Sequence, residues 1–130
     1  YITQKACPMW VPLVENNELS GEGASYFVRK YLDELFHADP LIDTVVLGCT
    51  HYPLLRGLIR HYVPQEVKVI EQGHIVADSL KDYLKRHTGM EAALSKQQTI
   101  RYLTTEQPDL FVSMAGMFMG EQIEAEHISI

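Results

Sequence analysis

The chain has 130 residues, the length of one ordinary domain, and can bury a core without disulfide or metal cross-links. Hydrophobic residues make up 46%, charged residues 22%, and the formal net charge is −6. This composition is typical of a globular protein and is too acidic for one that wraps a phosphate backbone. No apolar run reaches membrane-spanning length, and two cysteines do not make a disulfide framework. We therefore expect a cytoplasmic protein that binds neither nucleic acid nor membrane.

The first half of the chain alternates strand-like and helical patterns. It opens at Tyr1 without an initiator methionine, which favours a piece of a longer protein, in a β-branched stretch that we expect to form a first strand. Apolar residues between 27 and 35 recur at helical spacing, and Pro40 should end this helix. The apolar run 42–47, followed by Gly48, predicts a strand covered on both faces of a parallel sheet.

The alternation continues to the end of the chain. We expect a helix over 53–62, a strand over 67–70, a helix over 76–84, a polar loop over 87–98, a strand near 100–103, a helix over 110–118 and an edge strand within 126–130. Strands separated by helices of this length indicate βαβ units, a mostly parallel sheet and an α/β fold.

Ligands of such folds bind where strands end and loops lead into helices, and one of these loops is rich in reactive groups. Cys49 stands between the strand 42–47 and the helix expected from Pro53, whose amides and dipole would favour a thiolate. His51 can donate a proton nearby, and Thr50 offers a hydroxyl and an amide to a carboxylate. A nucleophile or general base is about as probable from position alone as a buried structural cysteine.

Other titratable residues give weaker signals. Glu15 ends an apolar stretch and could orient His51 or act on a substrate, although the sequence alone favours a solvated loop residue. Cys7 has no basic neighbour that follows closely, which favours a structural role. The remaining histidines lack the spacing of a metal site and are interpreted as surface residues: His37, His61, His74, His87 and His127.

The segment 47–55, with the sequence LGCTHYPLL, resembles the second signature of the bacterial glutamate racemases. The upstream segment 6–15, ACPMWVPLVE, is also similar to that family, and the resemblance covers essentially the whole chain. Aspartate racemases are similar around Cys49 and Thr50 but typically lack a histidine at the position of His51.

The resemblance implies an α/β three-layer sandwich and an isomerase of the aspartate/glutamate racemase type. Such enzymes interconvert L- and D-glutamate for peptidoglycan, and hence for cell wall and cell shape, with two cysteines on opposite sides of the α-carbon and without a cofactor or metal. It makes Cys49 one of these cysteines, gives Thr50 and His51 substrate-binding or assisting roles, and places Glu15 on the same side.

The chain departs from the family pattern in one respect. The N-terminal half, with its Asp-Ser-Gly and Ala-Cys-Asn-Thr motifs, is not present, and Cys7 is followed by proline rather than asparagine and threonine. Residues 1–130 are thus expected to be the C-terminal portion of a two-domain racemase, inactive alone and partnered by the missing half. Met9, Trp10 and Pro12 are candidates for an apolar rim exposed by its absence, so the chain is expected to self-associate or to be marginally stable. The oligomeric state, a homodimer included, stays open.

Two other interpretations remain open at this point. Cys49 and His51 could serve a Cys–His hydrolase or thiol-transfer domain, which would form a covalent acyl intermediate. Alternatively, Cys49 is a core residue of a non-catalytic module that binds an anion at the strand ends.

Overall fold

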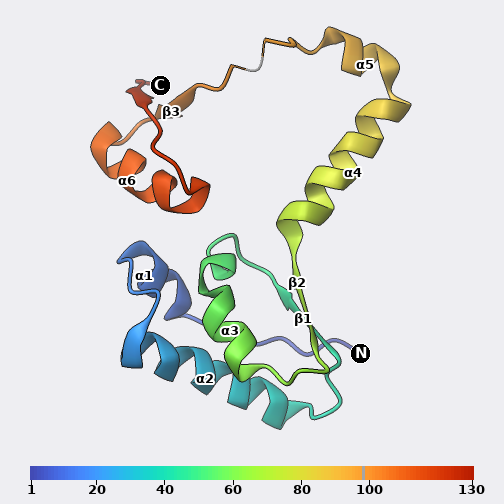
Figure 1. Ribbon diagram of the computed structural model, residues 1–130, viewed down its shortest axis with the longest axis vertical. Coiled ribbons are helices and arrows are strands. Elements are labelled where there is room, and N and C mark those ends of the chain that lie inside the picture. The colour runs from blue at the N-terminus through green and yellow to red at the C-terminus, as the bar shows by residue number, and fades with distance from the viewer. Residues whose placement is uncertain (98) are drawn as a thin grey trace. The chain divides into compact units, whose positions relative to one another are not determined.

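The computed structural model describes residues 1–97 and 99–130 as an alternation of helices and short strands (Figure 1). In chain order these are α1 (Trp10–Glu15), α2 (Gly21–Ala38), β1 (Thr44–Leu47), the 3₁₀ helix η1 (Tyr52–Leu55), α3 (Arg56–Tyr62), β2 (Lys68–Glu71), α4 (Gln72–Arg86), α5 (Thr88–Ala93), β3 (Tyr102–Thr104), α6 (Pro108–Met119) and β4 (Ala125–His127). The strands pair in parallel, β1 with β2 and β3 with β4. The predicted α/β class with parallel strands is therefore confirmed.

The chain divides into two units, residues 1–82 and 83–130. The first unit is a βαβ unit in which η1 and α3 cross from β1 to β2, with Val45 opposite Val69 in the register. Helix α2 packs against α3, and α1 packs against both α2 and η1. This arrangement follows from the sequence, because the strands are short and apolar and each helix has an apolar face that packs against its neighbours.

The core of the first unit lies between its helices and one face of β1. The largest fully buried side chains are Leu55, Ile59, Val14 and Val28. Val45 and Leu47 of β1 belong to the same cluster, whereas Val46, on the other face, is 58% exposed. The prediction that this strand is covered on both faces is therefore wrong, because successive side chains alternate and the described helices cover only one face.

The second unit is a smaller βαβ unit, in which α6 crosses from β3 to β4 and Leu103 lies opposite Glu126. Helix α6 ends at Gly120, whose φ of 69° is the left-handed conformation that glycine adopts without strain. Among the described residues of this unit only Thr104 and Ile123 are buried. It thus has the βαβ connectivity without a comparable core.

Several other local predictions need correction. Residues 1–9 form no strand. A β-branched residue such as Ile2 favours a strand only where a neighbouring strand can pair with it, and Ile2 is exposed. The expected polar loop 87–98 contains α5, and its residue 98 lies outside the described part of the chain. The predicted stripe of α4 is amphipathic but unburied, with Val76 and Leu80 exposed. No helix in the described ranges is long and apolar enough to cross a membrane.

Candidate active site

Cys49 lies in the turn that follows β1, as the sequence predicts. The backbone N–H of Tyr52 donates to the Cys49 carbonyl at 3.3 Å and closes this turn. The regular α-helix expected to begin at Pro53 begins only at Arg56, because η1 comes first. The thiol is therefore not followed directly by the free amides of an α-helix, and its chemistry must depend on nearby side chains.

His51 is the nearest such side chain. Its Nδ1 lies 3.7 Å from Cys49 Sγ and 3.4 Å from the hydroxyl oxygen of Thr50. The side chain of His51 is 26% exposed, so the ring is partly buried against the turn. A thiol, an imidazole and a hydroxyl thus meet within one three-residue turn, where protons can pass between sulfur and nitrogen.

Glu15 completes this group from a distant part of the sequence. It is the last residue of α1, and its Oε1 lies 3.6 Å from His51 Nε2, on the opposite side of the ring from Cys49. This distance is that of a loose ion pair rather than a hydrogen bond. The structure therefore brings together all four predicted site residues in the order Glu15, His51, then Cys49 and Thr50, with half of the Glu15 side chain exposed.

Tyr52 adjoins this group and was not singled out from the sequence. Its ring packs edge-on against Trp10, with ring centroids 4.8 Å apart and an interplanar angle of 79°. Burial raises the pKa of the Tyr52 hydroxyl, and the negative charges that Cys7 and Cys49 can carry raise it further. The phenol is therefore neutral near pH 7. Its position directly after the signature histidine was a signal available in the sequence.

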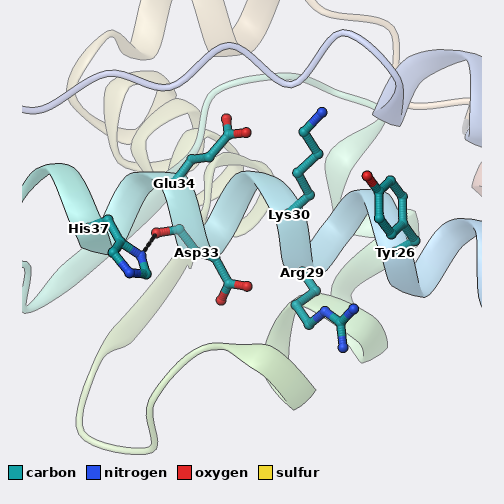
Figure 2. A pocket seen from close by; sticks show the side chains of 6 residues that line it. All are labelled: Tyr26, Arg29, Lys30, Asp33, Glu34 and His37. Atoms are coloured by element: carbon teal, nitrogen blue, oxygen red, sulfur yellow. Dashed lines mark hydrogen bonds between the residues drawn. The ribbon is translucent and has the colours of Figure 1, made fainter.

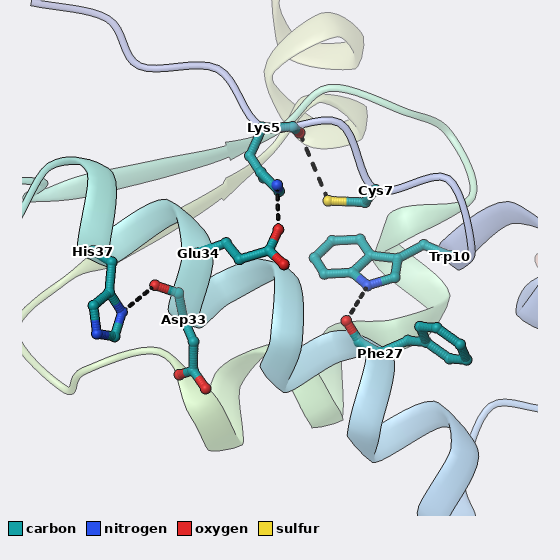
Figure 3. Close-up of polar contacts among 7 residues, drawn as sticks. All are labelled: Lys5, Cys7, Trp10, Phe27, Asp33, Glu34 and His37. Atoms are coloured by element: carbon teal, nitrogen blue, oxygen red, sulfur yellow. Dashed lines mark hydrogen bonds and ion pairs between the residues drawn. The ribbon is translucent and has the colours of Figure 1, made fainter.

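Cys7 is chemically different from Cys49. It is 8% exposed, its thiol donates to the Lys5 carbonyl with Sγ and oxygen 3.7 Å apart, and burial raises its pKa to about 11 (Figure 3). Lys5 also pairs with Glu34 of α2, and its hydrogen bond lowers the pKa of that carboxyl. Cys7 is thus a protonated thiol in the core, close to Lys5, which the ion pair with Glu34 ties to α2. This agrees with the structural role expected for Cys7.

Elsewhere the described residues offer little chemistry. A shallow pocket is lined only by residues of α2: Tyr26, Arg29, Lys30, Asp33, Glu34 and His37 (Figure 2). The five histidines interpreted as surface residues are all exposed. Within residues 1–97 and 99–130, no group of three or more His, Cys, Asp or Glu side chains is placed to hold a metal ion.

Comparison with known proteins identifies relatives of this chain. No protein-family profile matches it. It is 36% identical over 132 residues to the glutamate racemase of Streptococcus equi subsp. equi, an alignment that covers 99% of this chain and 48% of the relative. Among solved structures, a glutamate racemase isoform from Bacillus anthracis superposes with a TM-score of 0.80 at 30% identity, over 97% of this chain and 46% of that one.

The chain is homologous to the glutamate racemases. It spans about half the length of the curated relatives it matches and corresponds to the C-terminal portion of the glutamate racemases. The glutamate racemase of Francisella tularensis, solved in complex with D-glutamate, has a TM-score of 0.80 at 26% identity, over 96% of this chain and 46% of that one. The resemblance drawn from the motif at 47–55 is confirmed.

Proposed function

We propose that this chain forms one wall of the active site of a glutamate racemase, which interconverts L- and D-glutamate by two-base proton transfer. The arrangement of Glu15, His51 and Cys49, on a chain homologous to glutamate racemases over 99% of its length, carries this proposal. The product D-glutamate would supply peptidoglycan synthesis in the cytoplasm. Neither a cofactor nor a metal takes part in the proposed reaction.

Cys49 is the acid–base group of this wall. As a thiolate it takes the α-proton from one enantiomer of glutamate, so that the C–H bond breaks, its electron pair stays on the α-carbon and an S–H bond forms. A second cysteine, in the remaining half of the enzyme, protonates the carbanion from the opposite face. A positioned acid–base group contributes about 10²–10⁴-fold, so both cysteines and the surrounding donors are needed.

His51 and Glu15 prepare Cys49 for this step. A hydrogen on His51 Nε2 faces Glu15, which leaves Nδ1 to accept the proton of the Cys49 thiol across 3.7 Å. The Glu15 carboxylate then stabilises the positive charge on the ring. Thr50, at the exposed side of the turn, binds the substrate carboxylate through its hydroxyl or its amide.

The test is circular dichroism of L-glutamate, which follows its conversion into the D-enantiomer. We expect no turnover by the chain alone, and turnover when it is joined to the half of the Streptococcus equi racemase that it does not match. In deuterium oxide the product enantiomer should carry deuterium at the α-carbon, because the second base supplies a solvent-derived proton.

Substitutions in the joined enzyme then test the role of Cys49. Cys49→Ser should lower turnover by at least about 10²-fold, while the matched control Cys7→Ala, at a thiol outside the site, should retain it. Equal losses in both variants would contradict the role of Cys49. A thioester trapped on Cys49 by an acyl substrate would support a hydrolase instead.

A further inference from the structure

Helix α1 both carries Glu15 and anchors itself through its first residue, Trp10. Trp10 was expected at an exposed rim, but it is 3% exposed and is a core residue. A helix this short has little stability of its own, so its position must come from the contacts of its side chains. Trp10 and Val14 are the buried residues of α1, and Trp10 is the one with polar and aromatic contacts to other elements.

One of these contacts joins α1 to α2. The indole Nε1–H donates to the backbone carbonyl of Phe27 at 3.3 Å (Figure 3), and the indole lies 6.3 Å, between ring centroids, from Tyr31. Buried indole groups usually have such a hydrogen-bond partner, which fixes the plane of the ring as well as its depth. The indole is thus oriented by a helix that contributes no residue to the candidate site.

The other contact reaches the catalytic turn. The Trp10 ring meets Tyr52 edge-on, and Tyr52 directly follows His51. The Tyr52 backbone N–H also closes the turn onto the Cys49 carbonyl. Any displacement of the Tyr52 ring would therefore be transmitted to the backbone that holds the imidazole and the thiol.

We propose that the Trp10–Tyr52 contact sets the distance between Glu15 and His51, which makes Trp10 a positioning residue of the site. Glu15 and His51 come from separate elements, α1 and the turn before η1, and the aromatic pair spans the junction between them. The 3.6 Å separation is loose enough to be lost by a small shift of α1. This inference rests on the proposed function for its meaning in catalysis, whereas its geometry does not.

The first test is a double-mutant cycle in the joined enzyme described above. Glu15→Gln should lower kcat in the parent enzyme, and this penalty should shrink by about tenfold in Trp10→Leu and in Tyr52→Leu, a coupling typical of residues in one network. Trp10→Phe keeps an aromatic edge against Tyr52 and should restore most of the penalty. The matched control Val67→Ala, at a buried position outside this junction, should lower stability but leave the penalty unchanged.

The second test needs no racemase activity. In NMR spectra of the 130-residue chain, Glu15→Gln should shift the ring signals of His51, and this shift should be absent in the Trp10→Leu and Tyr52→Leu backgrounds. A lower melting temperature with an unchanged Glu15→Gln effect, by either measurement, would overturn the proposal and leave Trp10 as a core residue only. Because the spectra report on geometry alone, failure of the racemase assignment and failure of this inference are distinguishable.

Discussion

The two units share one topology and differ in what they bury. In residues 1–82, a parallel strand pair, its crossover and two further helices enclose a core that includes Val28, Leu55 and Ile59. In residues 83–130, a strand pair and its crossover leave Leu103, Leu110 and Phe118 at least 40% exposed. The βαβ connectivity alone therefore does not make a core; the additional helices α1 and α2 do.

The candidate site lies entirely in the unit that has the core. Glu15, Cys49, Thr50 and His51 all belong to residues 1–82. A site whose groups must hold positions to within fractions of an ångström needs rigid elements behind it. The second unit, where only Thr104 and Ile123 are buried among the described residues, offers no such rigid support.

The largest expected difference between the units concerns core substitutions. Ile59→Ala removes a fully buried side chain and should lower the free energy of unfolding by about 2–5 kcal/mol. Leu110→Ala, at a position 59% exposed, should change it by less than about 0.5 kcal/mol. Amide hydrogen exchange at increasing urea concentrations measures this, because it reports the stability of each unit separately. Similar losses for both substitutions would show that the second unit has a core of its own.

The exposed side chains of α4 provide a second contrast. Ile75, Val76 and Leu80 are each at least 55% exposed, so we expect the chain alone to self-associate through apolar surface. Sedimentation velocity should show Ile75→Gln/Leu80→Gln as a smaller species than the parent chain. The matched control Lys81→Gln, on the same helix, should leave the association unchanged. A monomeric parent chain would contradict this prediction.

The sequence predicts most of the helices and strands of both units. It does not predict which of their apolar faces are buried. Apolar periodicity locates β1, β2, α2 and α6 because it reports which face of an element can be buried. It does not report whether a partner is present, so Val46 and Leu80 were expected to be covered and are exposed. The N-terminal stretch was expected to be a strand for the same reason, although pairing is a property of two segments.

In the candidate site, too, the sequence predicts the local contacts better than the long-range ones. The proximity of Cys49, Thr50 and His51 is local and is determined by their spacing in one turn. The approach of Glu15 depends on how α1 packs, which its apolar neighbours suggest only weakly. Trp10 was predicted, with Met9 and Pro12, to lie at an apolar rim that the missing half leaves exposed, yet it contacts both α2 and η1.

Cys7 allows a pH test of the core of the first unit. Its folded pKa of about 11 lies above the usual 9.0, so its contribution to stability is complete below pH 9 and is lost as the pH rises toward 11. The loss should be on the order of 2 kcal/mol in the free energy of unfolding. Urea unfolding between pH 8 and about pH 11 should show a flatter dependence for Cys7→Ala, which retains the other titrating groups. Parallel curves for the two proteins would indicate that the thiol is not buried.

The smallest effect on stability is expected when the Arg101–Glu126 ion pair of the second unit is removed. Arg101 binds the carboxylate of Glu126 through two nitrogens, at 3.2 and 2.7 Å, and this lowers the Glu126 pKa, so that any contribution to stability is present at neutral pH and lost in acid. Arg101→Gln should return the Glu126 pKa toward its ordinary range in carbon-detected NMR titrations. Amide exchange in β3 and β4 should hardly change, as in the control Lys96→Gln, which removes another exposed pair. If amide protection in β3 and β4 disappears, this pair, rather than packing on another part of the protein, holds the two strands together.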